Sequence, residues 1–166
     1  IENNDIIFIN SSSTAIKILQ YIGDKRVVVI TNNGKVLGMN LSPKIEVILT
    51  GGQVYGRKQS MIGDIATQII STITATKCFI GVSGIASHCG ISTSVFQETT
   101  INMKMLENCN GPTFVLADSS KIGIHHNFSS GSIDNVNYVI TDKNADESEV
   151  KKLEEKGVKV IFSEEN

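Results

Sequence analysis

The chain has 166 residues, of which 40% are hydrophobic and 5% aromatic, and its formal net charge is −2 with an isoelectric point near 5.9. This size and apolar content predict one globular domain over residues 1–166 and exclude wholesale disorder. The sequence has no apolar run near the roughly 20 residues of a membrane-spanning helix, no basic start typical of a signal peptide, and no basic excess of the kind that nucleic-acid binding requires.

Three cysteines, Cys78, Cys89 and Cys109, are an odd number without the spacing of metal ligands. Unpaired cysteines suit a reducing compartment, so we expect a cytoplasmic protein rather than a secreted one. The chain begins at Ile1 instead of Met, and we therefore expect a processed product or a piece of a longer polypeptide.

The first half of the chain alternates short β-branched runs with helix-like segments. Strands are predicted at residues 6–9, 26–31, 45–49 and 78–82. Helices are predicted at residues 14–22, near 35–41 and at 61–73. The first of these helices would bury Ala15, Ile18, Leu19 and Ile22 on one face. Residues 51–60, with three glycines, and residues 83–97 are predicted to be loops.

The second half continues the alternation. A helix is predicted at residues 98–108, and strands at 113–117, 138–141 and 158–162. Asp146 can cap a further helix that ends at Gly157, with Glu149 as its capping-box partner. Continuous apolar strands between helices predict an α/β fold of three layers, with a mostly parallel sheet covered on both faces. Ligands of such sheets bind beyond the carboxyl ends of the strands.

Polar turns follow the first two strands at this edge. The first turn is Asn10, Ser11, Ser12, Ser13 and Thr14, whose hydroxyls and amides at a helix start suit an anion such as a phosphate. Ordinary helix capping also explains this stretch. The second turn contains Thr31 and Asn32, and alone it indicates only a turn.

Three more polar turns follow the next strands. Gly51 and Gly52 permit close backbone approach, and Arg57, beside Lys58, could neutralise a phosphate; a flexible surface loop is the alternative. Ser83 and Gly84 lie in a glycine-flanked segment suited to a polar small molecule. Asp118 and Lys121 could contact sugar hydroxyls and a phosphate, or form a local salt bridge. Together the turns predict a concave site for a phosphorylated small ligand.

Two pairs of adjacent residues include potential metal ligands. They are His88 with Cys89, and His125 with His126. Adjacent side chains seldom share a tetrahedral ion, and no third ligand is suitably spaced, so we expect neither a metal nor another cofactor.

The motifs, taken in order, resemble the C-terminal sensor domain of DeoR-type bacterial transcription repressors. The matching stretches are residues 8–14, 29–32, 45–52, 79–85, 90–93, 98, 117–121, 133–134 and 139–142. The resemblance implies a fold like that of ribose-5-phosphate isomerases and CoA transferases, a sugar-phosphate effector and a homo-oligomer (dimer or tetramer). It also implies that operator DNA is bound by an N-terminal winged helix-turn-helix domain, which is absent from this chain.

The resemblance assigns roles to individual residues. It implies a phosphate loop at residues 11–14. It implies further ligand contacts from Thr31, Asn32, Gly52, Ser83, Gly84, Glu98, Asp118 and Lys121.

The chain departs from the family pattern at four positions. Asn10 replaces an acid and Ser12 a glycine of the first loop, Ser83 stands where many members carry Asp, and Asn102 where Lys is common. These changes bear on which sugar phosphate binds, and how tightly.

The sequence favours a sensor over an enzyme. Isomerases of this fold carry an Asp-Gly-Ala-Asp segment, whereas residues 83–86 read Ser-Gly-Ile-Ala and lack both acids. An active sugar-phosphate isomerase and a purely structural module that binds no ligand are the alternatives. If the domain is a sensor, we expect residues 51–60 and 83–97 to move when the ligand binds.

Overall fold

The computed structural model describes residues 1–163 of the chain, without the side chain of Arg57. Its centre is a seven-stranded sheet in the order β12-β11-β9-β6-β1-β2-β3, and all of its neighbouring strands run parallel. The strands are β1 (Ile6–Ile9), β2 (Val27–Thr31), β3 (Ile45–Leu49), β6 (Lys77–Gly81), β9 (Thr113–Leu116), β11 (Tyr138–Thr141) and β12 (Lys159–Phe162). The predicted strands and the predicted parallel sheet are confirmed, and no strand end differs from its prediction by more than one residue.

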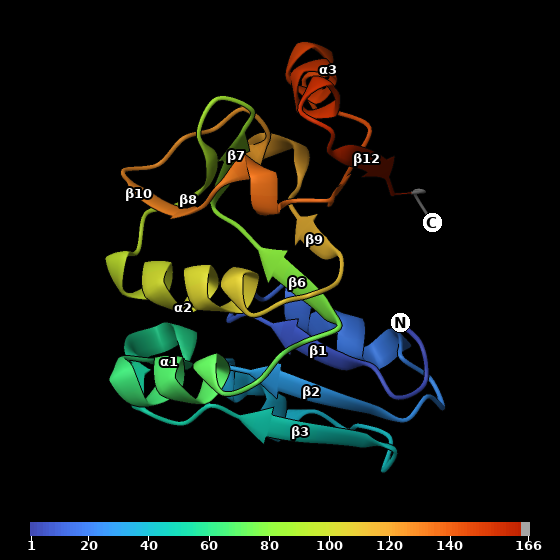
Figure 1. Cartoon of the computed structure of the whole chain (residues 1–166), viewed down its shortest axis with the longest axis vertical. Helices are drawn as coiled ribbons and strands as arrows, with labels where there is room; N and C mark the ends of the chain where they lie inside the picture. Colours follow the sequence, from blue (N-terminus) through green and yellow to red (C-terminus); the bar gives the residue numbers. More distant parts are fainter. Residues whose placement is uncertain (164–166) are drawn as a thin grey trace.

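Three α-helices cover one face of this sheet. They are α1 (Asp64–Ser71), α2 (Phe96–Glu107) and α3 (Glu147–Glu155). Figure 1 shows α1 and α2 side by side and α3 at the far end of the sheet, beside β12. Their apolar residues, such as Ile70, Met105 and Leu153, pack in one core cluster with Phe8 and Ile80 of the strands. None of the helices in the described part of the chain is both long and apolar enough to cross a bilayer.

The opposite face is covered by 3₁₀-helices instead of the predicted α-helices. They are η1 (Ala15–Tyr21) and η2 (Gly34–Gly38). In η1 the buried residues include Ile16, Leu19 and, at its end, Ile22, whereas Ile18 is only partly buried. A 3₁₀-helix has three residues per turn, so residues three apart share a face and Ile16 takes the place predicted for Ile18. The three-layer α/β prediction is confirmed, but one outer layer is 3₁₀.

The prediction of a loop at residues 51–60 is wrong, because these residues form most of a β-hairpin. β4 (Gln53–Tyr55), η3 (Gly56–Lys58) and β5 (Ser60–Ile62) make up this projection, which we call the arm. Met61 and Ile62 pair in β5, so helix α1 starts at Asp64 and not at residue 61 as predicted.

The predicted loop at residues 83–97 is also wrong. It contains β7 (Gly84–Ala86) and β8 (Gly90–Thr93), which pair with each other. β8 also pairs with β10 (Phe128–Gly131), a strand that the sequence did not indicate. These three strands form a separate antiparallel sheet, here called the small sheet, above α2 in Figure 1. Two further 3₁₀-helices are η4 (Ser119–Lys121) and η5 (Ile133–Asn135).

At the start of α3, the predicted cap is confirmed but the predicted capping box is not. Asp146 caps the helix by accepting a hydrogen bond from the Glu149 amide at 2.8 Å. The Glu149 carboxylate does not act as the predicted capping-box partner, since it accepts a hydrogen bond from the Ser87 amide at 2.7 Å. Burial would raise the pKa of Glu149, but the hydrogen bonds from Ser87 and the charge of Lys152 lower it. This carboxylate therefore ties α3 to the segment after β7.

Candidate ligand-binding site

A hollow of about 320 Å³ lies at the carboxyl edge of the parallel sheet, where the sequence predicts a site. Its size is at the lower end of the range for small-molecule sites. Its lining comes from the loop after β1, the end of β6, η2, the arm, α2 and η4. The lining residues are Asn10, Ser11, Ser12, Ser13, Thr14, Lys35, Lys58, Gly81, Val82, Ser83, Glu98 and Lys121. The predicted first turn thus lies in one place with Ser83, Glu98 and Lys121.

Asn10 anchors the first turn beneath the hollow. Its side-chain amide donates to the Gly81 carbonyl at 2.9 Å and to Oδ1 of Asn102 at 3.0 Å, and its own Oδ1 accepts from the Gly81 amide at 3.0 Å. Asn10 and Asn102 are both buried. Two of the four departures from the family pattern are therefore in contact with each other, as a neutral amide pair where the pattern has an acid and a lysine.

Ser12 caps the start of η1 from within the chain. Its Oγ accepts hydrogen bonds from the amides of Thr14 at 3.1 Å and Ala15 at 3.2 Å. A Cβ on Gly81 would lie 1.8 Å from this Oγ, so only glycine at position 81 leaves room for the Ser12 side chain. The capping interpretation therefore applies to Ser12. Ser11, Ser13 and Thr14 also line the hollow, but the amides of Thr14 and Ala15 are bonded to Ser12 and not to their hydroxyls.

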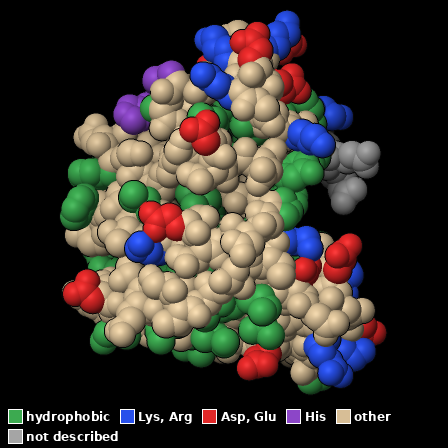
Figure 2. Space-filling view, in the orientation of Figure 1, with side chains coloured by type: hydrophobic (Ala, Val, Ile, Leu, Met, Phe, Trp, Pro, Cys, Tyr) green, Lys and Arg blue, Asp and Glu red, His purple; other side chains and the backbone are tan. Residues whose placement is uncertain are grey.

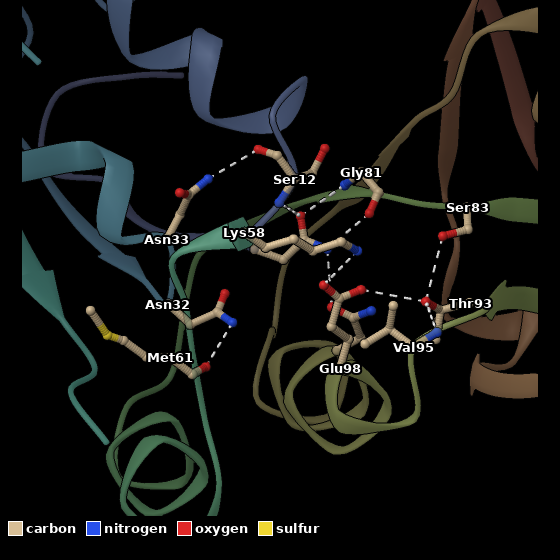
Figure 3. A network of polar contacts seen from close by, with 12 residues as sticks. Ser12, Asn32, Asn33, Lys58, Met61, Gly81, Ser83, Thr93, Val95 and Glu98 are labelled. Atoms are coloured by element: carbon tan, nitrogen blue, oxygen red, sulfur yellow. Dashed lines mark hydrogen bonds and ion pairs between the residues drawn. The ribbon is translucent and has the colours of Figure 1, made fainter. Parts of the chain in front are cut away.

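Charged side chains surround the hollow from several segments. They are three lysines, Lys35, Lys58 and Lys121, and one carboxylate, Glu98, which leaves an excess of two positive charges. Figure 3 shows Lys58 extended between Ser12 and Glu98, with its Nζ 3.0 Å from Oε1 of Glu98. The site prediction omitted Lys35 and Lys58. The sequence offered a signal for both: Lys35 directly follows the polar turn after the second strand, and Lys58 is the neighbour of Arg57.

Lys121 pairs with Asp118, the other charged residue predicted after β9. The Lys121 Nζ lies 3.0 Å from Oδ2 of Asp118. Hydrogen bonds from the Ser120 hydroxyl and from Lys121 lower the pKa of Asp118, so this carboxylate is ionised at neutral pH. Asp118 also caps η4 by accepting from the Ser120 amide. It lies beside the hollow, outside the lining residues, in the local salt bridge that the sequence allowed as an alternative.

The remaining predicted site residues lie outside the lining. Thr31 and Asn32 are completely buried; Thr31 Oγ1 accepts from the Asn33 amide, and the Asn32 side chain donates to the Met61 carbonyl at 3.0 Å (Figure 3). Gly51 and Gly52 have positive φ angles where the arm begins. The others are Arg57, which lies in η3 with its side chain outside the described atoms, and Gly84, which is buried in β7.

His88, His125 and Cys89 meet near β7, outside the lining of the hollow, whereas Nε2 of His126 lies 3.2 Å from the carbonyl of Ser83. Sγ of Cys89 lies 3.0 Å from Nδ1 of His125, and the rings of His88 and His125 are 6.1 Å apart. Burial and the nearby carboxylate of Glu149 raise the pKa of the Cys89 thiol. Within residues 1–163 no three His, Cys, Asp or Glu side chains gather in a way that could hold a metal ion.

Lysines and arginines are mixed with acids on the face that Figure 2 shows. Both signs gather around α3 at the top of the view and near the N-terminal strands at the lower right. This face therefore presents no continuous basic patch.

A parallel sheet between helical layers, with a polar and cationic hollow beyond its strand ends, is the architecture of a small-molecule-binding α/β domain. The family model described as the DeoR C terminal sensor domain matches residues 1–143. The chain belongs to this family.

Several relatives are transcriptional regulators. The regulator YulB of Bacillus subtilis is 33% identical over 96% of this chain and 62% of its own length. The regulator GolR of Listeria innocua is 29% identical over 99% of this chain and 65% of its own length. The lactose phosphotransferase system repressor of Staphylococcus epidermidis is 26% identical over 87% of this chain and 58% of its own length. The chain thus spans less than two thirds of the length of these relatives.

Among solved structures, the crystal structure of eIF2B beta from Chaetomium thermophilum is similar to this chain. The matched region covers 84% of this chain and 44% of the eIF2B beta chain. The TM-score is 0.48 and the sequence identity 12%. A similarity this distant supports no inference about this domain.

Proposed function

We propose that this domain is the effector-sensing part of a transcriptional repressor of sugar metabolism, and that it binds a phosphorylated sugar in the hollow. The observation that carries the proposal is the convergence of three lysines and the serine-rich turn on one hollow. Three lysines complement a phosphate monoester, which carries about −1.5 to −2 at neutral pH, although two of them pair with Glu98 and Asp118 in this structure. The name of one relative, a lactose phosphotransferase system repressor, supports a link to sugar metabolism.

Within this proposal the lining residues divide by chemistry. Lys121, Lys58 and Lys35 neutralise the phosphate, and the hydroxyls of Ser11, Ser13 and Thr14 donate hydrogen bonds to it. Ser83 and Glu98 face the sugar hydroxyls. The other predicted residues, Asn10, Ser12, Thr31, Asn32, Gly51, Gly52, Gly84 and Asp118, act on the ligand through the loops they belong to. Arg57 stays a predicted cation for the phosphate.

The proposal extends to the whole repressor. A separate N-terminal winged helix-turn-helix domain would bind operator DNA in the cytoplasm, and the ligand would shift the sensor between two arrangements with different DNA-binding competence. A homo-oligomer, dimer or tetramer, is part of the proposal. It is supported by the partly buried rings of Phe114 and Tyr138, which stack at 4.7 Å on the neighbouring strands β9 and β11; Phe114 also stacks on the buried Phe79 at 4.9 Å. Sedimentation of the purified chain tests this part.

An isomerase is disfavoured by the charges of the site. Aldose–ketose isomerisation needs a carboxylate that moves a proton between two carbons. Glu98 is the carboxylate among the lining residues, and it is paired with Lys58. Residues 83–86 contain no acid. With ribose 5-phosphate or fructose 6-phosphate as substrate, we expect no isomerisation; turnover above roughly 1 s⁻¹, the low end for ordinary enzymes, would contradict the sensor.

The direct test is a thermal-shift screen of phosphorylated sugars, each compared with the same sugar without its phosphate. A ligand at 100 times its Kd stabilises the folded chain by about 2.7 kcal/mol. We expect a shift with at least one phosphorylated sugar and a much smaller shift with its unphosphorylated form. No shift with any of them would favour a purely structural module.

A further inference from the structure

The ion pair between Lys58 and Glu98 joins two parts of the molecule across the hollow. Lys58 ends η3 at the tip of the arm, and Glu98 lies in the first turn of α2. Their charged atoms are 3.0 Å apart (Figure 3). The Lys58 side chain is 47% exposed and that of Glu98 12% exposed, so the carboxylate is largely enclosed while the ammonium remains open to the hollow.

Glu98 also connects to the small sheet. Its second oxygen, Oε2, accepts a hydrogen bond from the Thr93 hydroxyl at 3.4 Å. The same hydroxyl lies 3.5 Å from Oγ of Ser83, which precedes β7 (Figure 3). One carboxylate therefore links the arm, α2 and the small sheet, which include most of the two segments expected to move.

The arm is attached to the segment after β2 through the backbone of its second half. Its ends lie next to glycines with positive φ, Gly52 at 102° and Gly63 at 85°. The Met61 amide donates to the Asn32 carbonyl at 2.7 Å, and at the tip the Gln59 carbonyl accepts from the Gly34 amide at 2.8 Å. The backbone of the tip is therefore held independently of the pair between Lys58 and Glu98, and this pair fixes the position of the Lys58 side chain.

We propose that Glu98 is a built-in competitor for the anionic group of the ligand: it holds Lys58 in the absence of ligand, and an incoming phosphate takes Lys58 from it and leaves the carboxylate with the Thr93 hydroxyl. This inference rests on the proposed function. The Lys58 side of the ion pair is half-exposed, and solvent weakens such a pair, whereas a phosphate offers more charge and several acceptor oxygens for charge-assisted hydrogen bonds. The differential interaction that a ligand needs to shift a conformation is supplied by this exchange of partners.

The test compares inorganic phosphate binding to the full chain and its variants by calorimetry at constant ionic strength. Glu98→Gln keeps the size of the side chain but removes the competing charge, so phosphate should bind about threefold more tightly. Lys58→Met removes the exchanged cation, so phosphate should bind about tenfold more weakly. In the double variant the Glu98→Gln effect should disappear, because Glu98 acts through Lys58.

A matched control separates this exchange from a general change of charge. Glu107→Gln removes a carboxylate from the same helix, where Glu107 pairs with Lys104 at 2.6 Å away from the lining of the hollow. This variant should bind phosphate as the unmodified chain does.

The outcomes separate the two proposals. If phosphate binds the unmodified chain but Glu98→Gln binds it equally or more weakly, the competitor role is overturned and the proposed function stands. An equal gain in the Lys58→Met background, or in Glu107→Gln, also overturns the competitor role, because the effect would then not pass through Lys58. If neither inorganic phosphate nor any sugar phosphate binds the unmodified chain, both proposals fall.

Discussion

The two edges of the parallel sheet use the same kind of charge pair in different ways. At the amino edge, the carboxylate of Asp5, which is 7% exposed, accepts hydrogen bonds from Lys77 at 2.7 and 2.9 Å and from the Thr76 hydroxyl at 2.8 Å. At the carboxyl edge, Glu98 and Asp118 pair with lysines that also face a hollow. A carboxylate with all its partners inside the fold fastens strands, whereas a lysine facing open space can change partners.

The largest expected effect is therefore at the amino edge. Asp5→Ala leaves the mostly buried Lys77 without its nearest partner, and breaking such a pair should lower the free energy of unfolding by about 3 kcal/mol. Urea unfolding measures this loss. The matched control is Asp24→Ala, because Asp24 pairs with Lys44 at 3.8 Å on the surface; it should change stability by less than about 0.5 kcal/mol. Equal losses in the two variants would show that burial does not distinguish these pairs.

Acid should weaken the amino edge in a defined direction. Burial would raise the pKa of Asp5, but the hydrogen bond from Lys77 and those from the Glu2 amide and Thr76 outweigh it, so the pKa is lowered. The folded state then binds fewer protons than the unfolded state. The stabilisation by Asp5 is complete above the unfolded pKa of about 3.9 and is lost as the pH falls through the lower folded pKa.

The comparison of the unmodified chain with Asp5→Asn isolates this residue. The stability difference between the two should be constant near neutral pH and should narrow below about pH 4. The comparison is necessary because Asp118, Asp142 and Glu149 also have lowered pKa values and contribute to acid sensitivity in the same direction. A difference that stays constant down to pH 3 would contradict the assignment to Asp5.

A third prediction concerns the buried layer beneath the hollow, where tight packing reaches the carboxyl edge. Asn10→Asp places a carboxylate against the Gly81 carbonyl and Oδ1 of Asn102, and should cost about 2 kcal/mol of stability. Asn102→Lys should also destabilise the chain. Together they restore the charges of the family pattern, so the double variant should recover at least about 1 kcal/mol relative to the sum of the single changes. Additive losses in urea unfolding would contradict this coupling.

The sequence predicted what local patterns encode. The strands of the parallel sheet were predictable because strands buried on both faces are continuous apolar runs, as in Val27–Thr31. The small sheet was not, because its strands are rich in glycine and serine instead of continuous apolar residues, as in Phe128–Gly131, and because β10 pairs with β8 over a long sequence separation, with Phe128 opposite Thr93. The 3₁₀ form of η1 was missed because a short apolar spacing suits both kinds of helix.

The same limit applies to the site. The serine-rich turn was predictable, since the end of a parallel strand fixes where it lies. Lys35 and Lys58 were not included in the site, because a lysine in a loop is usually solvated and only the fold decides whether it faces a hollow. Asn32 and Gly84 were predicted to contact the ligand, but their polar and glycine character serves packing at the base of the arm and in β7.

The smallest expected effect on stability is at the carboxyl edge. It tests whether the pair of Lys121 and Asp118 serves ligand binding and not stability. Lys121→Ala removes a lysine that lines the hollow and leaves Asp118, which is 54% exposed and can be solvated. We expect a stability change below about 0.5 kcal/mol, but binding of a phosphorylated sugar about tenfold weaker, with little change for the unphosphorylated sugar. Calorimetric titration with both sugars measures the contrast.

Two outcomes would contradict this prediction. Equal losses of affinity for both sugars would remove Lys121 from phosphate recognition. A loss of stability as large as that of Asp5→Ala would mean that the charge pairs at the two edges play the same role.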